Sequence, residues 1–243
     1  MSMRRPVALA FDLDNTLWDI DPVMERAERA LHEWLARHYP RITDNHSIET
    51  MHDRRSAVAR RRPDLAHDFT ALRKLALHEH AEEAGYPVTI VDQAFEHFYT
   101  VRNQVELYAD VLPALDRLRP GYRLLALTNG NADLKRIGIE HYFELVVTAR
   151  GVGHAKPDTR IFAALLAGAG IAPGDLLYVG DEPVADVEGP RKAGIDAVWI
   201  NRGGIEWPAD LDPPRHRVTT LHELVDWLES SLELSGQPRP SHR

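Results

Sequence analysis

The chain has 243 residues, of which 44% are hydrophobic and 27% charged, so it can bury a sizeable core without disulfides or a structural metal. Its net charge of -8 argues against a general nucleic-acid binder, and the lack of cysteine excludes disulfides, thiolate zinc sites and cysteine nucleophiles. The apolar run at residues 7–11 is too short for a signal peptide, and no stretch approaches the ~20 apolar residues of a membrane span. We therefore expect a cytoplasmic protein that does not enter membranes.

Short apolar runs predict strands that are buried on both faces. They lie at residues 7–11, 122–128, 145–148, 176–180 and 197–200. From residue 107 onward, patterns typical of helices separate these runs. Strand and helix alternation of this kind predicts an α/β fold, with a doubly wound parallel sheet and helices on both faces.

Residues 21–106 break the alternation, because they contain amphipathic helical patterns and no convincing buried strand. Pro22 suits a first helical turn, Asp68 suits an N-cap, and Gly85 suits the end of a helix. We therefore expect residues 1–20 and 107–233 to form the α/β core. Residues 21–106 are expected to form an inserted helical domain, and residues 234–243 a disordered tail.

The first apolar run ends in "FDLDNTLWD", which places two carboxylates, Asp12 and Asp14, at the end of a strand. Their side chains point to the same side, because the side-chain period of a strand is two. The alternation of Asp12, Asp14 and Thr16 resembles the start of a calcium-binding EF-hand loop. However, Leu17 stands where that loop needs glycine. An acidic strand end is also common in ordinary folds, so the pair does not define a function alone.

Polar motifs follow the later strands as well. "TNG" contains Thr128 and Asn129, Lys156 follows in "GHAKPD", and "GDEPVAD" contains Asp181 and Asp186. In open parallel sheets, ligands bind beyond the carboxyl ends of the strands. The sequence therefore predicts one site that joins these motifs to the acidic pair.

Together, "DLDNT", "TNG", the lysine and "GDEPVAD" resemble the motifs of the haloacid dehalogenase superfamily of phosphohydrolases, over residues 7–201. That resemblance implies a Rossmann-like core with an α-helical cap of the first type. "FDLDNTLWDIDPV", "LTNGNA", "HDFTALR" and "GDEPVADVEGPRKAGIDAVWIN" are further similar to a bacterial subgroup. Its members dephosphorylate FMN and 5-amino-6-(5-phosphoribitylamino)uracil, a precursor of riboflavin.

The resemblance implies a Mg²⁺-dependent phosphatase that acts on a small phosphorylated metabolite. Asp12 is expected to attack phosphorus, and Asp14 to act as general acid and base. The metal ligands would be Asp12, Asp181 and the backbone carbonyl of Asp14. The resemblance does not indicate an oligomeric state.

The remaining motif residues are expected to hold the phosphate and the metal site. Thr128 and the backbone of Asn129 would bind phosphate oxygens, and Lys156 would pair with both Asp12 and the phosphoryl group. Asp186 would orient a metal-bound water or the lysine.

Residues that could read the leaving group are harder to choose. Trp18 could stack on a flat ring or pack at the hinge. Arg54, Arg73 and Arg102 are interpreted as solvated helix residues, the alternative being contact with a second anionic group. Residues 150–154, "RGVGH", could approach the substrate or form an ordinary flexible loop.

Several other functions stay open. A phosphotransferase or mutase would pass the phosphoryl group to a second hydroxyl, and a relative without activity would only bind. A 2-haloacid dehalogenase is disfavoured, because halide leaves without a proton and needs no acid at Asp14. The histidines are assigned to background, since His78 and His80 are two residues apart and diverge around a helix.

Overall fold

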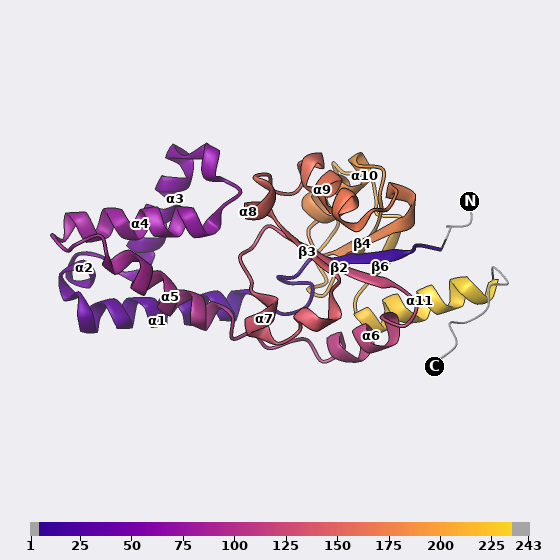
Figure 1. Ribbon diagram of the computed structural model, residues 1–243, viewed down its shortest axis with the longest axis horizontal. Helices are drawn as coiled ribbons and strands as arrows, with labels where there is room; N and C mark the ends of the chain where they lie inside the picture. The colour runs from indigo at the N-terminus through magenta and orange to yellow at the C-terminus, as the bar shows by residue number, and fades with distance from the viewer. Residues whose placement is uncertain (1–4, 235–243) are drawn as a thin grey trace. The chain divides into compact units, whose positions relative to one another are not determined.

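The computed structural model describes residues 5–234 and divides the chain into two compact units (Figure 1). One unit contains the described residues up to Asp19, Glu106–Gly130 and the described residues from Gly138 onward. The other contains Ile20–Val105 and Asn131–Ile137. They are called the sheet unit and the helical unit below.

The sheet unit is built on a six-stranded sheet in which every pair of neighbours is parallel. The strand order is β3-β2-β1-β4-β5-β6. The strands are β1 (Ala8–Phe11), β2 (Arg123–Thr128), β3 (Leu145–Thr148), β4 (Leu176–Gly180), β5 (Asp196–Ile200) and β6 (His216–Val218). This architecture confirms the predicted doubly wound α/β fold, although the sequence did not predict β6.

Strand β1 lies at the point where the order of the sheet reverses. Ala8 pairs with Arg123 of β2 on one side and with Leu176 of β4 on the other. The chain then continues outward from β2 to β3, and from β4 to β5 and β6. In open α/β sheets, the crevice at such a reversal is where ligands bind. The carboxyl ends of β1 and β4 are therefore the first place to look for a site.

Helices cover both faces of this sheet, with α9 and α10 on one face and α6 and α11 on the other (Figure 1). The helices and turns of the unit are α6 (Val111–Leu118), η2 (Glu140–Tyr142), α8 (Ala149–Val152), α9 (Thr159–Ala169), η3 (Pro173–Asp175), η4 (Pro183–Glu188), α10 (Gly189–Lys192) and α11 (Leu221–Leu234). Ile161 and Phe162 of α9 pack with Leu127 and Tyr178 in one core. Burial on both faces explains why the central strands are continuous apolar runs.

The helical unit contains α1 (Asp21–His38), α2 (Pro40–Asn45), α3 (Ile48–Arg61), η1 (Pro63–Leu65), α4 (Phe69–Glu83), α5 (Ile90–Arg102) and α7 (Leu134–Ile137). Its own core includes Leu31, Leu77 and Phe98. No helix among residues 5–234 is both long enough and apolar enough to cross a membrane.

One segment differs from the expected boundaries, since Asn131–Ile137 groups with the helical unit and not with the sheet unit. The Asn131 side chain donates to Thr70 Oγ1 (3.2 Å) and accepts from Arg102 Nε (3.1 Å). These bonds tie the segment to helices α4 and α5. At the other end, Leu234 still belongs to α11, and the rest of the predicted tail lies outside the described residues.

Candidate active site

A tight turn after β1 fixes the acidic pair. The Asp12 amide donates to Val179 O (2.9 Å) and so extends the pairing of β1 with β4. Asn15 has φ +61°, in the left-handed region that asparagine tolerates better than most residues. The turn brings Trp18 back beside Asp14, and its indole Nε1 donates to Asp14 Oδ1 (2.8 Å). The carboxyl group of Asp14 is therefore held in a set orientation.

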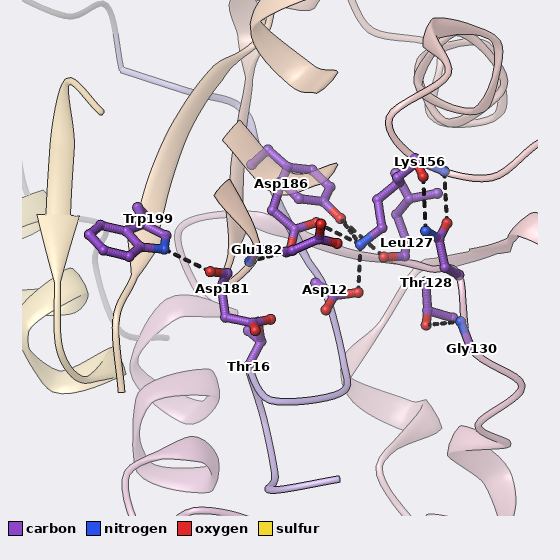
Figure 2. Close-up of polar contacts among 12 residues, drawn as sticks. Asp12, Thr16, Leu127, Thr128, Gly130, Lys156, Asp181, Glu182, Asp186 and Trp199 are labelled. Carbon is purple, nitrogen blue, oxygen red and sulfur yellow. Dashed lines mark hydrogen bonds and ion pairs between the residues drawn. The ribbon is translucent and has the colours of Figure 1, made fainter. Parts of the chain in front are cut away.

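The buried side chain of Lys156 connects polar groups from several parts of the sheet unit. Lys156 Nζ donates to Asp12 Oδ1 (2.6 Å) and Asp186 Oδ1 (2.6 Å), as Figure 2 shows, and also to Tyr178 OH (3.0 Å). The Tyr178 hydroxyl in turn donates to Leu127 O (3.1 Å). An ammonium group has three protons, so this network uses all of them. The side chain of Lys156 is only 3% exposed, which makes these charge-assisted bonds strong.

The side chain of Asn129 positions the lysine. Its Oδ1 accepts from the Lys156 amide (2.7 Å), and its Nδ2 donates to the Lys156 carbonyl (3.0 Å). The loop after β2 and the loop that carries the lysine are thus locked together; the Lys156-Pro157 peptide bond is cis. Beside them, Thr128 Oγ1 accepts from the Gly130 amide (2.9 Å), a bond that does not use the hydroxyl proton.

Three carboxylates meet at the ends of β1 and β4. Asp12, Asp181 and Asp186 each offer an oxygen, and these atoms lie within 4.8 Å of one another. Thr16 Oγ1 donates to Asp181 Oδ1 (3.2 Å), and Trp199 Nε1 donates to the Asp181 carbonyl (2.7 Å; Figure 2). Side-chain and backbone bonds therefore hold both ends of Asp181.

Gly180 explains how Asp186 can reach back to this cluster. A Cβ atom at Gly180 would lie 2.4 Å from Asp186 Cγ, a distance that real Cβ atoms do not show. Only glycine leaves room for that carboxylate. The Glu182 amide also donates to Asp186 Oδ2 (3.0 Å), so both of its oxygens are bonded.

Burial changes the proton affinities of this cluster. It raises the pKa of Asp12 well above its usual range, although Lys156 opposes the effect. Burial and the nearby Asp186 carboxylate raise the pKa of Asp181 to about 7. Burial alone would lower the pKa of Lys156, but Asp12 and Asp186 raise it well above its usual range, so its ammonium stays charged.

Three carboxylates thus share one ammonium, and a divalent cation would balance the remaining negative charge. A set of oxygen ligands suits hard cations such as Mg²⁺, Mn²⁺ and Ca²⁺. The cluster could therefore hold a divalent metal ion at Asp12 and Asp181, with Asp186 close behind them.

The structure brings most of the predicted site residues together and adds others. Thr16, Tyr178 and Gly180 were missed. A tyrosine on an otherwise aliphatic buried strand was an available signal, because a buried hydroxyl needs a partner. Trp18 is 0% exposed, which favours packing and the orientation of Asp14 over stacking on a substrate ring.

Two expectations about the arginines are wrong. Arg73 and Arg102 are buried, not solvated. Arg73 donates to both oxygens of Glu28 (3.0 and 2.8 Å). Its guanidinium carbon, Cζ, lies 3.5 Å from the centroid of the Phe98 ring. Although burial acts the other way, Arg73 and Arg55 lower the pKa of Glu28 to about 2. These contacts are the internal framework of the helical unit.

Arg54 and residues 150–154 also have defined positions. Arg54 is partly exposed and pairs with Glu83 (Nη2 to Oε2, 2.6 Å). Residues 150–154 were expected to approach the substrate or to form an ordinary flexible loop, and most of them belong to the short helix α8 (Ala149–Val152). Thr148 caps this helix, since its Oγ1 accepts from the Gly151 amide (3.0 Å).

A family model described as a haloacid dehalogenase-like hydrolase matches residues 7–194, so the chain belongs to this family of hydrolases. The match confirms the predicted superfamily. A curated relative is 5-amino-6-(5-phospho-D-ribitylamino)uracil phosphatase YigB of Escherichia coli (strain K12). It is 30% identical over an alignment of 199 residues, and the alignment covers 79% of this chain and 82% of the relative.

Two solved structures have the same fold. One is a 2-haloacid dehalogenase from Pseudomonas syringae pv. Tomato DC3000, with a TM-score of 0.87 and 34% identity over 93% of this chain and 99% of that one. The other is a HAD phosphatase from Thermococcus onnurineus, with a TM-score of 0.67 and 28% identity over 91% and 97% of the two chains. The phosphatases among these relatives support the predicted class, a phosphoric monoester hydrolase.

Proposed function

We propose that the chain is a Mg²⁺-dependent phosphatase that hydrolyses small phosphomonoesters through an aspartyl-phosphate on Asp12. The observation that carries the proposal is the buried bonding of Lys156 to Asp12 and Asp186, next to a second carboxyl group, Asp14, held by Trp18. A nucleophile, a cation for the phosphoryl group and a proton donor are thus present in one place.

The metal would be held by the carboxylates of Asp12 and Asp181, together with the backbone carbonyl of Asp14 that the family resemblance adds. Asp186 would act behind them, because its two oxygens are bonded to Lys156 and the Glu182 amide. Bound Mg²⁺ would supply positive charge that offsets repulsion between the carboxylates and an anionic substrate.

Asp12 would attack phosphorus, forming a bond from its carboxylate oxygen as the bond from phosphorus to the ester oxygen breaks. Asp14 would give its proton to the leaving alkoxide, which departs as an alcohol. Asp14 would then take a proton from water, whose oxygen attacks phosphorus and displaces the Asp12 carboxylate. The products are an alcohol and inorganic phosphate, and both carboxyl groups return to their starting states.

Lys156 would stabilise the charge on the phosphoryl oxygens as well as orient Asp12. The hydroxyl proton of Thr128 is available for a phosphate oxygen, because its bond with the Gly130 amide uses only the oxygen. The backbone of Asn129 would complete the phosphate site, while the Asn129 side chain holds Lys156 in place.

The substrate proposed first is a ribityl phosphate, either FMN or the phosphorylated pyrimidine precursor of riboflavin. The support is the resemblance of the motifs to that subgroup and the match with the phosphatase of E. coli. Transfer of the phosphoryl group to a sugar hydroxyl in place of water is a variant of the same chemistry.

Dehalogenation is the second candidate, because the 2-haloacid dehalogenase of P. syringae covers 93% of this chain. The position of Asp14 argues against it. A carboxyl group two residues after the nucleophile, oriented by Trp18, serves a leaving alkoxide, which needs a proton, and is of no use to a leaving halide.

Phosphate release from a panel of phosphomonoesters tests the proposal. The panel contains FMN, a ribityl phosphate and sugar phosphates, with and without Mg²⁺; halide release from 2-chloropropionate and transfer to an added sugar are assayed in parallel. We expect Mg²⁺-dependent phosphate release that is lost in Asp12→Asn. Halide release without phosphate release would support the second candidate instead, and release of neither would overturn both.

A further inference from the structure

A second cluster of ligand-type side chains lies inside the helical unit, where the phosphatase chemistry does not use it. His46 follows α2, and His80 and Glu83 belong to α4. Each offers one nitrogen or oxygen, and these atoms lie within 4.8 Å of one another. His80 and Glu83 are three residues apart on a helix and so lie on the same face.

The buried imidazole of His80 lacks hydrogen bonds within the described part of the chain. Its side chain is buried, with 1% of the residue exposed, and neither ring nitrogen has a hydrogen-bond partner among residues 5–234. A neutral imidazole carries one N–H donor and one lone pair, and leaving both unsatisfied in a protein interior is costly. The nearest ring is that of His46, with 4.4 Å between the centroids.

A hydrogen bond to the backbone of His46 helps to hold this residue beside His80. His32 Nε2 lies 3.0 Å from the His46 carbonyl oxygen, which can only accept, so His32 donates. The side chain of His46 is 12% exposed, and its Nε2 lies 3.6 Å from Glu83 Oε2. The His46 ring therefore presents Nε2 to Glu83, in the space that it shares with His80.

We propose that His46, His80 and Glu83 bind a divalent transition metal, with Zn²⁺ the ion that fits best. Two imidazoles and a carboxylate form a donor set that suits Zn²⁺, whereas Mg²⁺ prefers oxygen ligands. With metal–ligand distances near 2.1 Å, the ligands of a tetrahedral site lie about 3.4 Å apart. The 3.6 Å separation of His46 Nε2 and Glu83 Oε2 is already close to that value.

Arg54 is the charged group that opposes metal binding here, since its guanidinium contacts Glu83 Oε2 (2.6 Å). The same oxygen lies 3.6 Å from His46 Nε2, so metal binding requires the guanidinium to move to Oε1 while Oε2 turns to the metal. Arg54 then orients the ligand from behind, as groups outside the ligand shell of metal sites often do. Solvent fills the fourth position, because the side chain of Glu83 is 49% exposed.

The metal would fasten the His46 segment to α4 within the helical unit. It differs in chemistry from the carboxylate cluster of the sheet unit, which has only oxygen ligands. This difference allows the two sites to be measured separately, because excess Mg²⁺ occupies the oxygen site and leaves the imidazoles free.

The test is calorimetric titration of the full-length protein with Zn²⁺ in excess Mg²⁺. We expect one Zn²⁺ per chain whose affinity falls more than ~100-fold in His46→Ala, His80→Gln and Glu83→Gln. His78→Ala is the matched control: this histidine lies on the same helix, is 40% exposed and should leave binding unchanged. Asp181→Asn identifies any Zn²⁺ that replaces Mg²⁺ in the sheet unit.

Circular dichroism and thermal unfolding show whether each variant is folded. If His80→Gln fails to fold, Glu83→Gln decides the question, since an exposed glutamate can be changed without disturbing the core. Absence of Zn²⁺ binding by the wild-type protein would overturn the proposal. Binding of equal strength in Glu83→Gln and His46→Ala would also overturn it, because the ion would then lie elsewhere.

Discussion

Asp181→Asn is expected to change how the stability of the protein depends on pH and Mg²⁺. Folding raises the pKa of this carboxyl group from 3.8 to about 7. A raised pKa means that the folded state holds the proton more tightly, so its stabilising effect is present below pH 3.8 and is lost as the pH rises through about 7. The metal-free wild-type protein should therefore lose stability between about pH 4 and pH 8.

The size of the effect follows from that shift. One pKa unit corresponds to about 1.4 kcal/mol, so Asp181 alone can contribute at most about 4 kcal/mol. For a domain of this size, each kcal/mol shifts the Tm by about 2–4 °C. Because Asp12 lies beside Asp181 and its pKa is raised as well, the two carboxyl groups titrate together, and we expect a smaller change of several degrees.

The substitution separates charge from shape. The amide of Asn keeps an oxygen for the bond from Thr16 but cannot ionise. Without metal, we expect the variant to be more stable than the wild type at about pH 8 and nearly equal at about pH 4. With Mg²⁺, the wild type should gain stability at the higher pH and the variant should gain little.

Thermal unfolding followed by circular dichroism, with EDTA or Mg²⁺ across this pH range, gives both quantities. Glu206→Gln is a control for the loss of one negative charge, since Glu206 is exposed on the same unit. The reasoning is refuted if metal-free Asp181→Asn follows the wild-type pH profile. It is refuted equally if Mg²⁺ stabilises the variant as much as the wild type.

Further substitutions test the other parts of the site. Asp14→Asn should lower kcat for alkyl phosphates by about 10²–10⁴-fold. The loss should be smaller for an aryl phosphate, whose leaving group departs without a proton. If the alkyl and aryl phosphates lose activity equally, in steady-state and in single-turnover assays, Asp14 does not act as an acid. Gly180→Ala should displace Asp186 and lower phosphate release, whereas Gly174→Ala, which has space for a Cβ, should not. Lys156→Met should lower the free energy of unfolding in denaturant by about 3–5 kcal/mol, because it leaves buried carboxylates without their cation; an unchanged value would exclude a buried ion pair.

The sheet could be predicted well because its central strands are buried on both faces. Such strands are short apolar runs, which can be recognised in the sequence without knowledge of the fold. Strand β6 escaped prediction, since "HRV" has three residues and a polar start and lies at an edge of the sheet. The bounds of helix α3 were not predicted, although Arg54 was expected to lie on a helix, because α3 is strongly charged and Val58 is its only buried residue.

The motif residues of the site could be predicted because ligands bind beyond the carboxyl ends of parallel strands. That rule needs only the positions of the strands in the sequence. The bond between Lys156 and Tyr178 could not, since it depends on how side chains of different strands meet. The same limit applies in the helical unit. His80 was compared with His78, its neighbour in sequence, while its neighbour in space is His46.

The covalent role of Asp12 is tested most directly by trapping the intermediate. The enzyme is mixed with Mg²⁺ and its best phosphate ester, quenched during the first turnover and reduced with borohydride, which converts an aspartyl-phosphate to homoserine. Mass spectrometry of the peptide that contains residue 12 should show homoserine at that position in the wild type and not in Asp12→Asn. Phosphate release with no modified residue, or with the modification at another carboxylate, would contradict the proposed mechanism.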